Sequence, residues 1–589
     1  MKNLIIGFIS LALLSGCKKF LDRTPLDKLT EEQAFASENT LQLYTNSFSV
    51  LMLPDGPGIF MGDVMSDITV PNTVPGYIAG KVTSQEATGW NWDNLRNINY
   101  FLENYNNPEI PQKARNHYAG IAHFFRAYFY YNMVKQFGDV PWYGQTMSVG
   151  DTASLFKARD SRTLVMDSVM ADLNFAVDNI YSTKDNTCTQ ITKWVALAYK
   201  SRICLFEGTF RKYHTEYALP DANKWLQEAA GAADLLIKSG QYRLQNSAAP
   251  EKDYRSLFIS EIPVANEVLL AAVYNNTLKR WHNAAWWFNS ATLGARLGLS
   301  KSFINTYLNI DGTSFTSKAG YDTMQFATEV KNRDKRLQQT IRMGDYKRTD
   351  GSVAPPDFTV TYSGYQIQKF SLDDKYFDTR TESYNSIPIM RYAEVLLNYA
   401  EAKAELGALS AADWDLSIGA LRRRAGISNN TMPVTADPYM ANYFREDNND
   451  PKVLEIRRER GIELAAEGNR YDDLRRWKEG RLLERFYDGI YVPEKGRLLD
   501  LNEDGKFDVT FVDKIPATRV PGVVYFVIDN TNSKLSEGTK GNLIWLSNIQ
   551  KQFEDPAAAD PKVKSKRYLY PIPFNEMIIN PRLQQNPGW

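Results

Sequence analysis

The sequence predicts a mostly α-helical protein in which tetratricopeptide-like helix pairs form a scaffold, while long irregular loops and a few short strands lie on a ligand-binding side. Two observations predict this class. Helical periodicity recurs in segments of about 15 residues with short breaks, and small residues stand where helices would approach one another. Between these segments lie proline- and glycine-rich stretches much longer than ordinary connections. No strict repeat of roughly 34 residues can be aligned.

The periodicity places the scaffold helices at about 30–53, 92–240 and 388–480. The loop-rich regions cover about 54–91, 241–387 and 481–589. In the first of them, repeated proline and glycine allow no regular element of any length. In the second, residues 267–274 form an apolar run that is typical of a buried strand or a short helix. Loops of such length are commonly functional.

Residues 454–477 are dense in charge, and the only cations among them are arginines. Glu459, Glu463 and Glu467 recur every four residues, so we expect them on one flank of a helix. Gly468 and Asn469 then predict a stop and a second, shorter helix. Arginine suits partly buried carboxylate pairs, so the segment predicts a helical hairpin tied by arginine–carboxylate bridges. A glycosidase acid/base pair is the alternative, but flanking arginines would lower the pKa that a general acid needs raised.

The predicted hairpin also supplies apolar side chains to the core, namely Leu464, Tyr471, Leu474 and Trp477.

The first 17 residues resemble a bacterial lipoprotein signal. A mainly apolar run over residues 4–14 is too short to span a bilayer, and small residues precede Cys17. This pattern predicts cleavage before Cys17 and lipidation of its thiol; an ordinary signal peptide with an incidental cysteine is the alternative. Cys188 and Cys204 form neither a disulfide framework nor a zinc site, and we assign them no chemistry.

The composition is neutral but rich in aromatic residues. The 69 basic and 69 acidic residues balance, so nothing indicates nucleic acid or an electrostatic membrane patch. The 33 tyrosines, 29 phenylalanines and 12 tryptophans offer flat faces that can stack on sugar rings. Core filling is the alternative for each of them. The predicted ligand contacts, all in loop-rich regions, are Asp67, Tyr77, Trp90, Trp281, Trp286 and Trp287.

The tryptophan group at 281–287 cannot place all three rings on one flank of a helix. We therefore expect at least one of these rings to be exposed or to lie in a loop.

One loop has the spacing of a calcium site. Oxygen ligands would come from Asp500, Asn502, Asp504, Lys506 and Asp508, with Gly505 at the sixth position. The twelfth position is Phe511 rather than glutamate, so the EF-hand pattern is incomplete. A structural calcium and a simple Asn/Asp/Gly-rich turn both remain open.

Signatures of enzymes are sparse. The chain has four histidines and none of the motifs of zinc proteases, serine hydrolases or nucleotide-binding loops. We therefore predict no enzymatic activity and no required cofactor.

Six segments, in order from end to end, resemble the SusD/RagB family of nutrient-binding outer-membrane lipoproteins. They are CKKFLDRTPLDKLTEEQAF near the N-terminus, FFRAYFYYNMVKQFGDVPW, NRDKRL, RYAEVLLNYAEAKAELG, RRERGIELAAEGNRYDDLRRW and the terminal YPIPFNEMIINPRLQQNPGW. The resemblance implies a single domain over 18–589 that binds oligosaccharide at the cell surface, without catalysis. It also implies lipid anchoring to the outer membrane and a SusC-like TonB-dependent transporter as partner. These motifs belong to the scaffold, so no ligand residue carries over from them.

Two other functions remain open at this point. The same fold could bind peptides or another nutrient, and a glycoside hydrolase on a helical scaffold is the remaining alternative.

Overall fold

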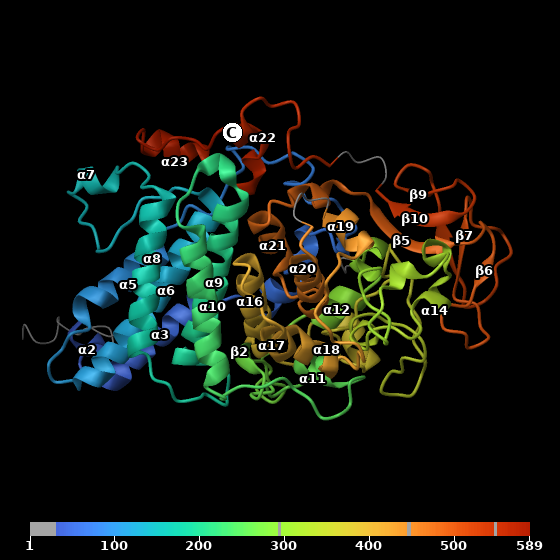
Figure 1. Ribbon diagram of the computed structural model, residues 1–589, viewed down its shortest axis with the longest axis horizontal. Coiled ribbons are helices and arrows are strands. Elements are labelled where there is room, and N and C mark those ends of the chain that lie inside the picture. The colour runs from blue at the N-terminus through green and yellow to red at the C-terminus, as the bar shows by residue number, and fades with distance from the viewer. Residues whose placement is uncertain (1–30, 293–295, 445–448, 547–550) are drawn as a thin grey trace, which may run out of the picture.

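The computed structural model describes residues 31–589 apart from 293–295, 445–448 and 547–550. Helices dominate the chain, and the strands are few and short (Figure 1). The predicted mostly helical class is confirmed. The signal segment and Cys17 lie outside the described residues.

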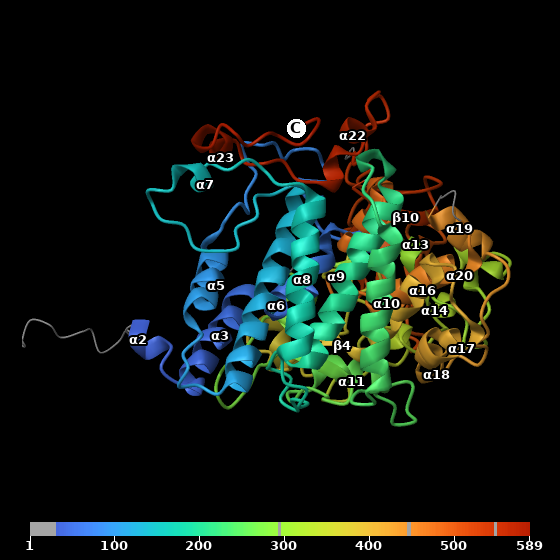
Figure 2. The same ribbon diagram turned by 60° about the vertical axis from the view of Figure 1, so that its left-hand side comes forward.

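Eight helices of twelve residues or more form the scaffold in the described part of the chain. They are α3 (Glu38–Met52), α5 (Asp93–Asn104), α6 (Gln112–Phe137), α8 (Arg162–Asn179), α9 (Lys193–Tyr213), α10 (Ala222–Lys238), α16 (Tyr392–Glu405) and α20 (Pro451–Glu463). Helix α6 packs on α8, α9 packs on α10, and α16 packs on both α10 and α20. Figure 2 shows α5, α6, α8, α9 and α10 standing side by side. This is the stacking of helix pairs that the periodicity predicts.

The remaining helices are short. The α-helices among them are α2 (Glu31–Ala34), α4 (Gly56–Phe60), α7 (Thr152–Leu155), α11 (Asp253–Ile259), α12 (Ala284–Asn289), α13 (Lys301–Ile304), α14 (Phe326–Glu329), α15 (Leu337–Thr340), α17 (Ala411–Trp414), α18 (Ala420–Arg424), α19 (Pro438–Phe444), α21 (Arg470–Arg476), α22 (Pro561–Lys564) and α23 (Phe574–Ile579). A π-helical turn, η7 (Asp415–Gly419), joins α17 to α18, so the three elements form one continuous but irregular helix.

Single turns of 3₁₀-helix occur throughout the loop-rich regions. They are η2 (Gly62–Met65), η3 (Thr215–Tyr217), η4 (Phe315–Ser317), η5 (Tyr321–Thr323), η6 (Lys375–Thr379), η8 (Gly480–Glu484) and η9 (Lys566–Tyr568).

The strands form four small sheets. The two-stranded antiparallel sheets are β1 (Thr69–Val70) with β3 (Gly298–Leu299), and β2 (Val268–Ala272) with β4 (Ile387–Arg391). The three-stranded sheets are β5 (Tyr487–Val492), β10 (Gly541–Trp545) and β9 (Ser533–Leu535), and β6 (Leu498–Leu499), β7 (Val509–Val512) and β8 (Val524–Val527). Both three-stranded sheets lie at the right-hand end of Figure 1. The apolar run at 267–274 is thus a strand.

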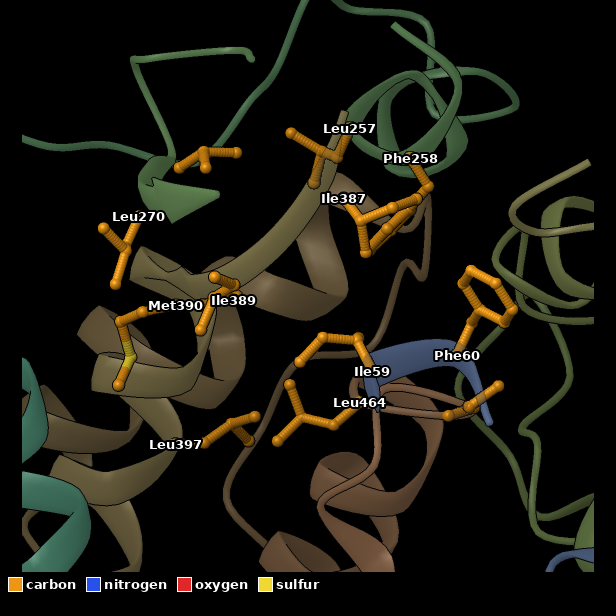
Figure 3. Close-up of a cluster of buried hydrophobic side chains, with 14 of the residues drawn as sticks. Ile59, Phe60, Leu257, Phe258, Leu270, Ile387, Ile389, Met390, Leu397 and Leu464 are labelled. Atoms are coloured by element: carbon orange, nitrogen blue, oxygen red, sulfur yellow. The ribbon is translucent and has the colours of Figure 1, made fainter. Parts of the chain in front are cut away.

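The main hydrophobic core joins the scaffold to the loops. Ile59 and Phe60 of α4 are 8 % and 0 % exposed and pack beside β4 and Leu464 (Figure 3). The backbone N–H of Gly56 donates to the Tyr274 hydroxyl at 2.8 Å. Burial of its side chains and this hydrogen bond therefore fix the short helix α4 against the core.

The hairpin differs from the prediction in one respect. Helix α20 ends at Glu463, so Glu467 lies in the turn and not on the same helix. Ala466 and Gly468 adopt left-handed backbone conformations with φ of 62° and 76°, which close the turn. A Cβ placed on Gly62 would lie 2.6 Å from the Gly468 Cα, so loop 54–91 touches the turn backbone to backbone.

Candidate functional site

The hairpin carboxylates form a buried ionic network. Both oxygens of Glu463 accept from Arg424 at 2.5 and 2.6 Å, and one also accepts from Arg391 at 2.5 Å. Arg336 donates to the other oxygen at 2.8 Å. Burial raises the pKa of Glu463, but these three guanidinium groups outweigh it and hold the pKa well below its ordinary value. A general acid needs the opposite shift.

The neighbouring carboxylates are bound in the same way. Glu459 pairs with Arg336 at 2.6 Å, and Glu467 receives two bonds from Arg391, at 2.7 and 2.8 Å, and one from Lys369 at 2.6 Å. These contacts confirm the predicted arginine–carboxylate bridges. The predicted core residues Leu464, Leu474 and Trp477 are buried, whereas Tyr471 is half-buried. The hairpin is scaffold.

Asp67 and Tyr77, predicted as ligand contacts, are engaged by the protein itself. The Asp67 carboxylate accepts from Arg470 at 2.8 and 2.9 Å and from the Tyr443 hydroxyl at 2.6 Å. Tyr77 stacks on Tyr570 with ring centroids 4.3 Å apart, and its hydroxyl donates to the Arg567 carbonyl at 2.9 Å. They are 8 % and 5 % exposed, so both side chains are engaged in packing within the protein.

Trp90 lies in a hydrophobic cluster separate from the main core. Its ring meets Phe137 edge-on at 5.1 Å and Trp92 at 5.4 Å. This packing corresponds to the core-filling alternative, in which Trp90 supports the helices that follow it, α5 and α6. Trp90 is nevertheless half-buried.

Trp281, Trp286 and Trp287 lie together at α12, and none of the three is buried. Ala284, Ala285 and Phe288 form the inner face of α12, with Phe288 stacked on Phe370 at 6.2 Å. Trp286 therefore lies on the opposite side of this short helix, whereas Trp287 lies on its flank and packs against the main core. Trp281 donates from Nε1 to the Asn276 side chain at 3.1 Å. The expectation that at least one ring escapes the core is confirmed.

Two buried polar atoms on this segment have no hydrogen-bond partner in the described structure. They are Trp287 Nε1 and Asn283 Oδ1. His282, by contrast, is held as a neutral packing residue: its Nδ1 accepts from the Ala284 N–H at 3.1 Å, Nε2 faces the Asn385 carbonyl at 2.9 Å, and burial lowers its pKa to about 4.

Sequence reasoning missed a second aromatic segment that the fold brings against α12. Backbone hydrogen bonds between His282 and Ser383 tie the tryptophan segment to the loop that follows η6. The adjoining η6, which contacts α12, presents Tyr376, which is 47 % exposed, with Phe377 edge-on to it at 5.1 Å. The Asn289 amide also donates to Asp378 at 2.9 Å. The aromatic run KYFD at 375–378 is visible in the sequence, but no local pattern predicts that it packs against residues about a hundred positions earlier.

A third aromatic pair flanks α12 on its C-terminal side. Tyr362 and Trp545 stack with centroids 3.9 Å apart and planes 13° from parallel. Arg296 lies over Tyr362 at 5.4 Å, donates to its hydroxyl at 3.1 Å, and donates to the Ala291 carbonyl at 2.8 Å. Both rings are half-buried. The surface of α12 thus has aromatic groups on two sides.

A cavity of about 290 Å³ lies between the C-terminal end of α3, strand β2 and the residues that precede α4. Asn46, Ser49, Asp55, Tyr274 and Arg280 are among its lining residues. Arg280 directly precedes Trp281, so the cavity borders the start of the tryptophan segment.

Comparison with known proteins identifies the family. The model described as "SusD family" matches residues 273–589, which is more than half of the chain. This chain belongs to the SusD family. A second model, described as "Starch-binding associating with outer membrane", matches residues 19–205. Together the two matches cover both scaffold and loops, and they support association with the outer membrane.

Individual members of the SusD family are distant but match over most of their length. SusD-like proteins P38 and P2 of Formosa agariphila are 25 % and 24 % identical, over 80 % and 82 % of this chain and 91 % and 92 % of theirs. A SusD-like protein of Bacteroides fragilis superposes with a TM-score of 0.67 at 20 % identity, covering 96 % of this chain and 100 % of that chain.

Another Bacteroides fragilis structure, described as a SusD-like carbohydrate-binding protein, gives a TM-score of 0.65 at 20 % identity, over 93 % of this chain and 99 % of that chain. These likenesses confirm the SusD fold.

The predicted calcium loop of this SusD-family chain is closed by its own backbone. Asp500 accepts from the backbone N–H of Asn502, Asp504 and Gly505, at 3.3, 3.3 and 2.9 Å. Burial, together with the charges of Asp500 and Asp504, raises the pKa of Asp508 to about 6. No group of three acidic, histidine or cysteine side chains in the described chain is arranged to hold a metal. Calcium binding at this turn stays a prediction.

Within the described residues, no helix is both long and apolar enough to cross a bilayer.

Proposed function

We propose that this SusD-family chain is a cell-surface, lipid-anchored protein that captures oligosaccharide and passes it to a SusC-like TonB-dependent transporter. The observation that carries the proposal is the half-exposed aromatic surface around α12, in which Trp281, Trp286 and Trp287 lie between two further aromatic groups. Stacked rings and neighbouring amides suit the apolar faces and hydroxyls of sugars. The starch-binding description of the second family model supports the same ligand class.

The proposed function involves no covalent chemistry. The carboxylates best placed to resemble an acid/base pair are saturated by arginines, which supports a scaffold role for them. Soluble protein incubated with a glycan panel should therefore release no new reducing ends. Turnover that disappears in Glu463→Gln would overturn the non-enzymatic part of the proposal.

Glycan capture is tested by affinity gel electrophoresis and calorimetry with plant, fungal and host polysaccharides. Trp286→Ala and Trp287→Ala should each weaken the best ligand about tenfold, since losing one stacking ring costs on the order of 1 kcal/mol. Trp90→Ala is the matched control, because its ring packs on Phe137, and binding should persist. Unchanged affinity in both α12 variants would place the site elsewhere.

Lipid anchoring is tested at Cys17. Metabolic labelling with a palmitate analogue should mark the wild type and not Cys17→Ser, and protease added to whole cells should digest only the anchored, surface-exposed protein. Co-purification of the transporter with tagged wild-type protein tests the proposed partner. A cytosolic protein with its first 17 residues intact would refute the anchor.

A further inference from the structure

The cations around α12 differ from those of the rest of the fold. In the hairpin network, each guanidinium that contacts Glu463 is paired with carboxylates. Around α12, the hydrogen bonds of Arg280 and Arg296 within the described residues go to backbone groups and a tyrosine hydroxyl, and none goes to a carboxylate. The sequence gives part of the reason: residues 268–300 contain Lys279, Arg280 and Arg296 and no aspartate or glutamate.

Arg296 is held in place with donors to spare. Its guanidinium donates two hydrogen bonds within the described residues, to the Tyr362 hydroxyl and the Ala291 carbonyl. A guanidinium has five N–H donors, so most of its capacity is unused by these two bonds. The residue is half-buried and adopts a left-handed backbone conformation with φ of 51°. Arg296 therefore places a positive charge beside the stacked rings of Tyr362 and Trp545.

Arg280 provides a second cation at the other end of the segment. Paired backbone hydrogen bonds of 3.0 Å with Asn275 close a tight turn that fixes its position. Its guanidinium lies 5.9 Å from the Tyr274 ring centroid and lines the polar cavity of about 290 Å³. The Arg280 side chain is exposed.

The residues packed behind α12 also include cations. Arg342 is 6 % exposed and donates to Asn289 at 2.9 Å, and burial and the charge of Arg348 lower its pKa to about 10. Asp378 is already bound to Arg348 and to the Asn289 amide, and Asp55, which lines the cavity with Arg280, accepts from the Gly58 N–H at 2.8 Å. Beyond it, Glu382 accepts from the Tyr376 hydroxyl at 2.7 Å. The acidic groups are thus engaged, while Arg280 and Arg296 are not.

We infer that the α12 surface selects acidic glycans, with Arg296 and Arg280 binding carboxylate or sulfate groups while the aromatic rings bind the sugar faces. The guanidinium fork matches the planar, two-oxygen geometry of a carboxylate and can span two oxygens of a sulfate ester. A neutral glycan would leave these donors to water, whereas an anionic one pairs with them and gains attraction along the whole polymer. This inference rests on the proposed glycan-binding function and specifies its ligand class.

The test compares polymers that differ only in charge. Calorimetry and affinity electrophoresis are run with polygalacturonate and its methyl ester, and with a sulfated galactan and its desulfated form. The wild type should bind at least one charged polymer about tenfold more tightly than its neutral counterpart, and added salt should weaken that binding. The two pairs distinguish carboxylate from sulfate.

Three variants assign the selectivity to residues. Arg296→Gln should bring the affinity for the charged polymer to within about threefold of the affinity for the neutral polymer. Arg296→Lys should restore part of the preference for the charged polymer, and Arg280→Gln should reduce that preference independently of Arg296. Arg423→Gln is the control of equal charge change, because Arg423 lies on α18 and pairs with Asp415. Circular dichroism and the melting temperature verify that each variant is folded. If Arg296→Gln unfolds, Arg280→Gln still tests the inference, because Arg280 lies in an exposed turn.

Two results would overturn the inference, and they are distinguishable. Equal binding of charged and neutral polymers, with no effect of either arginine variant but loss in Trp286→Ala, would refute acidic selectivity while leaving glycan capture standing. Absence of binding to every polymer in both panels would remove the proposed function and this inference together.

Discussion

Replacing Glu463 by glutamine tests whether the buried ionic network holds the scaffold together. The glutamate carboxylate, which is fully buried, receives bonds from Arg424 at 2.5 and 2.6 Å, from Arg391 at 2.5 Å and from Arg336 at 2.8 Å. Glutamine keeps the shape but removes the charge, and its amide N–H₂ would face guanidinium N–H groups. Breaking a buried ionic group in this way typically costs about 3–5 kcal/mol.

This cost is a large part of the stability of an ordinary domain, which is about 5–15 kcal/mol. Equilibrium unfolding in urea, followed by tryptophan fluorescence, measures it, since urea leaves ionic interactions unscreened. The control is Asp234→Asn, which breaks an exposed pair with Lys238 whose side chains are 30 % and 73 % accessible. We expect the control to change stability by less than about 0.5 kcal/mol. If Glu463→Gln changes it equally little, the network does not stabilise the fold.

Three further perturbations follow from particular contacts. Burial raises the pKa of Asp63 to about 7, so the stability of the protein should fall as the pH rises from about 4 to 7, because the buried carboxyl is forced to ionise. Asp63→Asn should therefore be more stable than the wild type above pH 7, by up to about 4 kcal/mol. Melting curves recorded across this pH range test the prediction, and no gain in the variant would contradict it. Gly62→Ala should lower the free energy of unfolding in urea by about 1–3 kcal/mol because its Cβ would lie 2.6 Å from the Gly468 Cα, whereas Gly231→Ala has open space around the new Cβ and serves as the control. Calcium added after chelation should raise the melting temperature of the wild type and not that of Asp500→Ala. If calcium leaves the wild-type melting curve unchanged, residues 500–508 form a turn that does not bind calcium.

The scaffold was predictable because its signals are local. Helical periodicity placed the long helices, and the exclusive use of arginine around Glu459 and Glu463 indicated buried pairing. The prediction erred where a single backbone choice decided the geometry: Ala466 enters the left-handed region, so α20 ends before Glu467 although the four-residue spacing continues. Spacing alone cannot distinguish a helix from a turn that happens to preserve contact with the same arginine.

The ligand side was only partly predictable because long-range contacts decide it. Asp67 and Tyr77 look available in a loop rich in proline and glycine, yet Arg470 and Tyr570, far along the chain, bury both. Conversely, Tyr376 becomes part of the α12 surface only because its loop is bridged to the tryptophan segment. Local composition reports whether a side chain could bind a ligand, and only the fold determines whether it is left free to do so.

The distribution of arginine carries this argument one step further. An arginine such as Arg391 that is surrounded by carboxylates has its donors satisfied inside the protein, and its removal costs stability. Arg296 has aromatic and carbonyl partners instead, so its charge is not neutralised by the described chain. Loss of Arg296 should therefore appear in ligand affinity more than in stability, whereas loss of Arg391 should appear in stability. That difference separates scaffold from site without any ligand-bound structure.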